Sequence, residues 1–102
     1  MSYQLSDLVR LMECLRDPEH GCPWDRGQTY QSIVPFTLEE AYEVSDVIER
    51  GVFDELQGEL GDLLFQVIFY ARLAEEDGSF TLDDVIDAIV SKLLERHPHV
   101  FP

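Results

Sequence analysis

Apolar residues recur at helical spacing in four stretches of this chain. In the first stretch, Leu and Met occupy positions 5, 8, 11, 12 and 15, which predicts an amphipathic helix. A segment rich in glycine and proline follows and predicts an ordered loop with a short helical turn over 29–34. The second helix is expected from Thr37 to about Arg50, because Thr37 and Glu40 form a capping-box pattern and Gly51 is a natural C-terminal stop.

The second half of the chain predicts two further helices. The third is expected over 53–77, and the fourth from Leu82 to about Arg96, with Thr81 as its N-cap and Pro98 as its limit. No strand-like alternation of useful length and no internal repeat is present in the sequence. Four helices with short connections predict an all-α domain that resembles a four-helix bundle.

The third predicted helix is apolar on nearly every side over residues 60–74. A helix of this kind is expected to have neighbours all around it. A domain of 102 residues has a thin core and cannot easily surround such a helix alone. We therefore predict a homodimer whose central helices complete the core.

The charge of the chain excludes several classes of partner. It has 21 acidic residues against seven basic ones and a formal net charge of −14, which opposes binding to nucleic acid.

No segment has the length and hydropathy of a membrane span, and the N-terminus does not resemble a signal peptide. We expect a cytoplasmic protein with free thiols at Cys14 and Cys22. An anionic ligand would need a divalent cation to mediate its contact with this chain.

Carboxylates form a pattern on the second and third predicted helices. Glu59, Asp62 and Gln66 fall within an arc of about 60° on one helix. If the helices pair antiparallel, Glu40 and Glu43 converge on this stripe. Each carboxylate alone suits an exposed or capping position. Together they repel one another unless a cation lies among them, and oxygen ligands without His or Cys select Mg²⁺, Mn²⁺ or Ca²⁺.

Longer motifs surround these carboxylates. The segments EEAYE at 39–43 and ELGD at 59–62 match the EExxE…ExxD signature of MazG-type nucleoside triphosphate pyrophosphohydrolases. The flanking segments LRDPEHGCPWDRGQTY, GELGDLLFQV and KLLERHPHVF match in the same order. The chain therefore resembles this family over nearly its whole length.

The resemblance implies an all-α MazG fold that dimerises and hydrolyses (deoxy)nucleoside triphosphates to a monophosphate and pyrophosphate. It implies Mg²⁺ as the cofactor, with Mn²⁺ as a substitute. Trp24 could stack on the base of the nucleotide, and packing in the core is the alternative for this residue. Lys92 and Arg96 could bind the triphosphate, and the alternative for them is that they are ordinary charges at a helix C-terminus. The implied metal ligands are Glu40, Glu43, Glu59 and Asp62, with Glu39 as a further carboxylate, and Lys92 and Arg96 resemble the family's basic pair for the triphosphate. We predict Glu39 as the general base, because it is not needed as a direct ligand. We predict Trp24 and Gln28 near the nucleoside.

The domain organisation leaves two interpretations open. Residues 1–102 are expected to form a single MazG-like domain, and two-domain members of this family carry a second copy of the signature beyond the segment that matches HPHVF. The chain is then either one domain by itself or the N-terminal half of a longer protein. Three functional hypotheses follow: an Mg²⁺-dependent hydrolase, a non-catalytic nucleotide- or metal-binding domain that dimerises and regulates a catalytic half, and a structural bundle with an acidic face.

Overall fold

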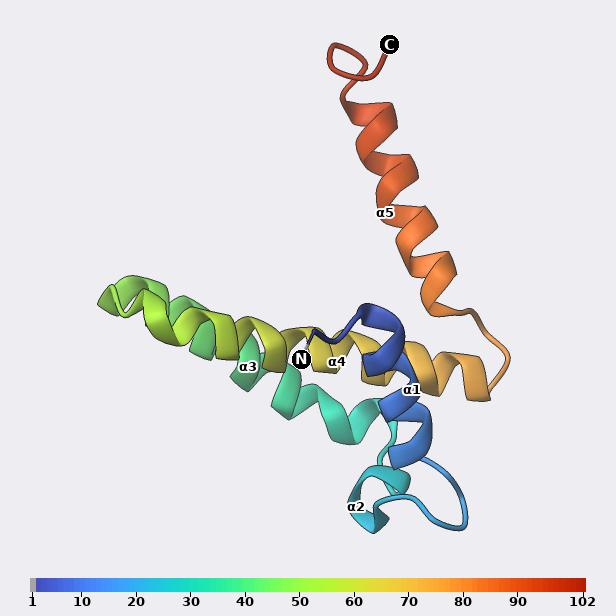
Figure 1. Ribbon diagram of the computed structural model, residues 1–102. Coiled ribbons are helices and arrows are strands. Elements are labelled where there is room, and N and C mark those ends of the chain that lie inside the picture. Colours follow the sequence, from blue (N-terminus) through green and yellow to red (C-terminus); the bar gives the residue numbers. More distant parts are fainter. Residues whose placement is uncertain (1) are drawn as a thin grey trace.

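The computed structural model describes residues 2–102, and within that range all regular structure is helical (Figure 1). The all-α prediction is confirmed. Among the same residues, no helix is both long enough and apolar enough to cross a bilayer. The elements, in chain order, are α1 (Leu5–Leu15), α2 (Pro23–Arg26), α3 (Tyr30–Arg50), the 3₁₀ turn η1 (Phe53–Glu55), α4 (Leu56–Glu76) and α5 (Leu82–Arg96).

Helix α3 begins at Tyr30 and not near Thr37, so the predicted start of this helix was wrong. The N-cap is Thr29, whose hydroxyl accepts a hydrogen bond from the Ser32 amide at 3.2 Å, while the Ser32 hydroxyl accepts one from the Thr29 amide at 2.7 Å. Pro35 lies inside the helix, where it lacks an N–H to donate. The helix continues through it because the capping box begins earlier and Ile33 is buried in the core.

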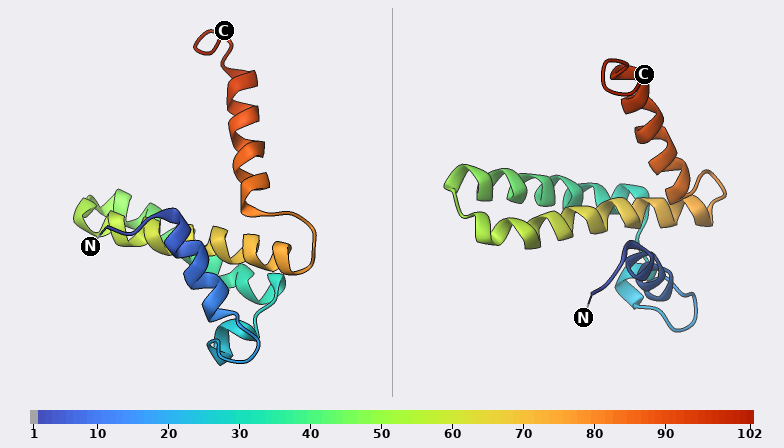
Figure 2. Two further views of the ribbon diagram at one scale, coloured as in Figure 1. Left: turned by 45° about the vertical axis from the view of Figure 1, so that its right-hand side comes forward. Right: turned by 45° about the horizontal axis from the view of Figure 1, so that its top comes forward.

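Helices α3 and α4 form an antiparallel pair that is the most extensively packed part of the chain (Figures 1 and 2). The turn between them depends on Gly51, which ends α3 in the left-handed conformation at φ 72°. Only glycine adopts this conformation without a steric penalty. Helix α1 packs against α4, and the core lies where these helices meet. Its buried members are Met12, Ile33, Ile68, Phe69 and Leu73.

Arg16 connects the end of α1 to two other segments. Its guanidinium, with a side chain only 9% exposed, donates two hydrogen bonds to the Glu76 carboxylate at 2.8 and 2.7 Å. It also donates to the backbone carbonyls of Asp25 and Gln28, and it lies over the ring of Phe69 at 5.6 Å from the centroid. The segment that carries α2 is thereby held against the end of α4.

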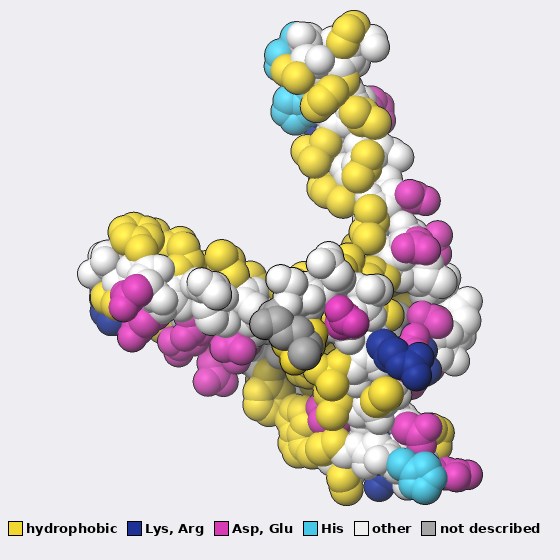
Figure 3. Space-filling model, in the orientation of Figure 1, with side chains coloured by type: hydrophobic (Ala, Val, Ile, Leu, Met, Phe, Trp, Pro, Cys, Tyr) yellow, Lys and Arg dark blue, Asp and Glu magenta, His cyan; other side chains and the backbone are white. Residues whose placement is uncertain are grey.

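Helix α5 leaves the end of α4 and points away from the α3–α4 pair (Figures 1 and 2). It begins as predicted, with Thr81 and Asp84 in a capping box, but none of its residues is buried. Figure 3 shows hydrophobic side chains along α5 and along the α3–α4 pair, on the sides that border the angle between them. One chain therefore does not close a four-helix bundle. The exposed apolar residues on α5 are Ile86, Ile89, Val90, Leu93 and Leu94, and those on α4 are Leu60, Leu64 and Val67.

Candidate metal centre

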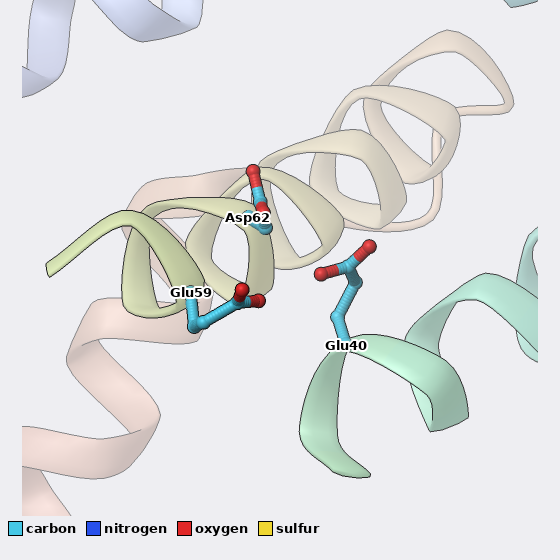
Figure 4. A group of neighbouring side chains, drawn as sticks. All are labelled: Glu40, Glu59 and Asp62. Carbon is cyan, nitrogen blue, oxygen red and sulfur yellow. The ribbon is translucent and has the colours of Figure 1, made fainter. Parts of the chain in front are cut away.

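Three carboxylates from two helices meet at the seam between α3 and α4 (Figure 4). Glu40 comes from α3, and Glu59 and Asp62 come from the first turns of α4. One oxygen of each lies within 4.8 Å of the others. Glu40 and Glu59 are half-buried and Asp62 is exposed. The antiparallel pairing that the sequence suggested therefore does bring these three residues together.

Among residues 2–102, no ion pair balances the negative charge of the trio. Burial raises the pKa of Glu40, and the carboxylates of Asp62 and Glu59 raise it further. Burial also raises the pKa of Glu59, followed by the effects of Asp62 and Glu43. Among residues 2–102, none of these four carboxylates takes part in an ion pair.

The positive charge of Arg50 lowers the pKa of Glu59, but this effect is smaller than the effects that raise it. Its guanidinium is already paired with Asp46 at 2.9 Å and with Glu55 at 3.4 Å. Arg50 is therefore engaged with carboxylates outside the trio.

The donor set fits a hard divalent cation. Mg²⁺ binds oxygen at about 2.1 Å in an octahedron, so two oxygens on the same ion are at most about 4.2 Å apart. The oxygens of Glu40, Glu59 and Asp62 are within 4.8 Å of one another. The site therefore suits Mg²⁺, Mn²⁺ or Ca²⁺ and lacks the sulfur and nitrogen ligands typical of zinc.

Two further glutamates on α3 border the trio. Glu43 is half-buried and close enough to raise the pKa of both Glu40 and Glu59, although its oxygens are outside the group of three. Glu39 is exposed and also raises the pKa of Glu40. Their positions suit a fourth ligand and an outer carboxylate, and these roles remain predictions.

Comparison with known proteins identifies the family. The MazG nucleotide pyrophosphohydrolase domain matches residues 28–101, which is more than half of the chain. This chain belongs to the MazG domain family. The resemblance seen in its motifs is thereby confirmed.

The MazG domain is also similar to curated bacterial proteins that are longer. It is 59% identical over 98 residues to a nucleoside triphosphate pyrophosphohydrolase of Escherichia coli K12, covering 96% of this chain and 37% of that protein. It is 50% identical over 95 residues to the nucleoside triphosphate pyrophosphohydrolase/pyrophosphatase MazG of Thermotoga maritima, covering 93% of this chain and 37% of that protein. The chain thus spans little more than a third of these relatives.

Trp24 packs beside α3 and not in the core. Its ring packs edge-on against Phe36 with centroids 5.4 Å apart, and Phe36 precedes Glu40 by one helical turn. Half of its surface is exposed, so core packing does not explain Trp24. Gln28 bonds to the same segment: its amide donates to the Trp24 carbonyl at 2.8 Å and accepts from the Ser32 hydroxyl at 2.7 Å, and its place at the nucleoside stays a prediction.

Lys92 and Arg96 are not beside the carboxylates within one chain. Both are exposed on α5, which points away from the α3–α4 pair (Figure 1). Within the described residues, 2–102, neither forms an ion pair. Their charges are therefore available to an anion, but the predicted basic pair and the predicted metal ligands stay apart in the single chain.

The sequence interpretation missed a hydrogen-bond network next to the trio. Thr37, predicted as an N-cap, instead places its hydroxyl 3.0 Å from the Gln66 side-chain oxygen and 2.6 Å from the Tyr70 hydroxyl. Gln66 is only 8% exposed. The sequence did contain a sign of this network, because Gln66 is a polar residue within an apolar helix, one turn beyond Asp62.

Proposed function

We propose that this MazG domain hydrolyses nucleoside and deoxynucleoside triphosphates to a monophosphate and pyrophosphate, with Mg²⁺ as its cofactor and Mn²⁺ as a substitute. The observation that carries the proposal is the trio of Glu40, Glu59 and Asp62, whose negative charge no ion pair among residues 2–102 balances. Family membership supports triphosphates as the substrate class. A chain with net charge −14 needs a cation to hold so anionic a substrate.

Glu40, Glu43, Glu59 and Asp62 would hold the ion. When bound, Mg²⁺ supplies charge neutralisation at the phosphate oxygens and lowers the pKa of water. Glu39, the exposed carboxylate beside the trio, would accept a proton from the attacking water. The water oxygen bonds to the α-phosphorus as the bond from that phosphorus to the α–β bridging oxygen breaks, and pyrophosphate leaves with that oxygen.

A homodimer is part of the proposal because the apolar faces of α4 and α5 have no cover in one chain. Leu93 and Leu94 on α5 are each nearly half exposed, as are Leu60 and Leu64 on α4. Large exposed apolar faces of this kind mark interfaces. We propose that a second copy covers them. Packing of α5 onto a partner would also carry Lys92 and Arg96 to a carboxylate trio that α5 does not approach in its own chain.

The deciding experiment is product analysis. The purified protein is incubated with Mg²⁺ and each of the common nucleoside triphosphates, and monophosphate, pyrophosphate and orthophosphate are quantified. We expect equal amounts of monophosphate and pyrophosphate, and loss of both in a Glu59→Gln/Asp62→Asn variant whose helical circular dichroism is unchanged. Orthophosphate as the first product would reject the assigned bond.

A mixing experiment tests the contribution of the second copy. One chain carries Glu59→Gln/Asp62→Asn and the other carries Lys92→Ala/Arg96→Ala. If each site takes its basic pair from the partner, heterodimers hold one site with both sets intact, and mixing two inactive variants restores part of the activity. Activity that stays absent after mixing, in dimers shown to exchange subunits, would reject the shared site. A monomeric mass by light scattering would reject the dimer itself.

A second candidate function follows from the length of the relatives. The chain matches 37% of the Escherichia coli and Thermotoga maritima proteins, so much of each relative has no counterpart here. The alternative is a catalytically weak or inactive domain that binds metal and nucleotide, dimerises, and regulates a catalytic half. Mg²⁺-dependent nucleotide binding without any turnover would favour this candidate over the hydrolase.

A further inference from the structure

Gln66 is a buried polar residue that the proposed reaction does not yet use. It lies on the face of α4 that carries Glu59 and Asp62, one turn beyond Asp62, and only 8% of its surface is exposed. A buried amide is costly unless its hydrogen-bonding groups have partners. Its partners therefore show what the residue is placed to do.

The Thr37–Tyr70 pair fixes the orientation of this amide. The Thr37 hydroxyl lies 3.0 Å from the Gln66 oxygen and 2.6 Å from the Tyr70 hydroxyl. The Thr37 hydroxyl also donates to the Ile33 carbonyl at 3.2 Å, so its one proton is shared between that carbonyl and the Gln66 oxygen, and Tyr70 donates to Thr37. Two helices thus hold one end of the amide in place.

The other end of the amide, its NH₂ group, has no acceptor among residues 2–102. Within the same range, no fully buried side-chain nitrogen or oxygen lacks a partner. The NH₂ group must therefore reach the surface, where a ligand can contact it. Gln66 presents an oriented, nearly buried donor whose acceptor the folded chain does not supply.

The position of this donor indicates which part of a substrate it meets. Thr37, its anchor, precedes Glu40 by three residues on α3, and Gln66 follows Asp62 by four on α4. The amide therefore lies one turn, about 5.4 Å, beyond the carboxylates along the seam. On α3 the same turn carries Phe36, which packs against the half-exposed Trp24. The carboxylates suit phosphates, whereas an aromatic pair suits the flat face of a base.

The geometry points to Gln66 as a specificity-determining residue whose amide NH₂ donates a hydrogen bond to the nucleoside part of the substrate. This inference rests on the proposed function, since it assumes that triphosphate binds at the trio. The amide contributes to the recognition of a nucleoside triphosphate and not to the chemistry at phosphorus. Thr37 is a positioning residue that acts by orienting the amide.

The test compares binding of two kinds of probe in the presence of Mg²⁺. One kind carries a nucleoside: the α,β-methylene analogues of ATP and dCTP, which resist hydrolysis at the relevant bond. The other kind is a methyl triphosphate with the same methylene bridge and no nucleoside. Dissociation constants are measured by calorimetry for the wild type and for Gln66→Met, which keeps the length and burial of the side chain but removes the donor.

We expect Gln66→Met to weaken binding of at least one nucleoside probe about tenfold, the scale of one lost hydrogen bond to a ligand, and to leave the methyl probe within about twofold. Thr37→Val should show the same selective loss, and Thr37→Ser, which keeps the hydroxyl, should restore it. Circular dichroism confirms that each variant folds.

Three results would overturn the inference, and they can be told apart. Equal weakening of nucleoside and methyl probes would place Gln66 at the phosphates or the metal. Unchanged binding of all probes by Gln66→Met would show that its amide contacts no ligand. Failure of the wild type to bind any probe with Mg²⁺ would reject the proposed function itself, and this inference with it.

Discussion

Replacing Arg16 by Met should be among the most destabilising changes to a charged residue in this protein. The guanidinium donates two hydrogen bonds to Glu76 and two more to backbone carbonyls, and the side chain is 9% exposed. Removing one partner of a buried ion pair typically costs about 3–5 kcal/mol. Glu76 is 32% exposed and keeps Arg72 at 3.2 Å, so part of that cost is relieved.

We therefore expect Arg16→Met to lower the free energy of unfolding by about 2–3 kcal/mol, a large share of the roughly 5–15 kcal/mol of a small domain. For a domain of this size the melting temperature should fall by roughly 10–20 °C. Met keeps the aliphatic part of the side chain but removes the guanidinium over Phe69, so the loss reports on the hydrogen bonds and this cation–π contact together. Urea unfolding followed by circular dichroism measures the change.

A matched control is available on the same helix. Arg10 is exposed and, within residues 2–102, forms no ion pair, so Arg10→Met should change stability by less than about 0.5 kcal/mol. Trp24 is the only tryptophan and lies in the segment that Arg16 holds. Acrylamide should therefore quench the Trp24 fluorescence of Arg16→Met more strongly than that of the wild type, before global unfolding. Equal stabilities of the two variants, or unchanged quenching, would refute this account of Arg16.

Three further predictions concern the metal centre and the loop. Mg²⁺ at about 100 times its dissociation constant should stabilise the protein by roughly 2.7 kcal/mol, measured by thermal unfolding. Na⁺ at matched ionic strength should not stabilise the wild type to this extent, and Mg²⁺ should not stabilise a Glu59→Gln/Asp62→Asn variant to this extent. Because the pKa values of Glu40 and Glu59 are raised, the metal-free folded state binds extra protons, and its free energy of unfolding should fall as pH rises through these values. If the free energy of unfolding of Glu40→Gln depended on pH as steeply as that of the wild type, this prediction would be contradicted. Gly21→Ala should cost about 3 kcal/mol in urea unfolding, since its Cβ would lie 2.3 Å from a backbone oxygen, whereas Gly27→Ala, at 3.5 Å, should cost little.

Local signals in the sequence predicted most of the helices. The capping box at Thr81 and the glycine at position 51 mark boundaries that the structure confirms, because each depends on neighbouring residues alone. The start of α3 was wrong because two capping patterns compete, one at Thr29 and one at Thr37. Burial of Ile33, a long-range effect, favours the earlier one.

The candidate site was predictable to the extent that it depends on one pair of helices. The spacing of Glu59 and Asp62, together with a short turn at Gly51, places them opposite Glu40. The role of Gln66 was not predictable, because its partner Thr37 was assigned to a helix end. The relation of Lys92 to the trio was also beyond local patterns, since α5 points away from the α3–α4 pair and none of its residues is buried.

The hairpin of α3 and α4 would link the proposed cofactor to folding kinetics. The contacts nearest the turn at Gly51 join residues that are close in sequence, so closing the hairpin there costs little loop entropy. Closing it brings Glu40 toward Glu59 and Asp62, and the growing repulsion opposes an otherwise favourable step. The same hairpin is thus locally frustrated without a cation and free of that conflict with one. Mg²⁺ would then act on the folding rate as well as on the stability of the folded state.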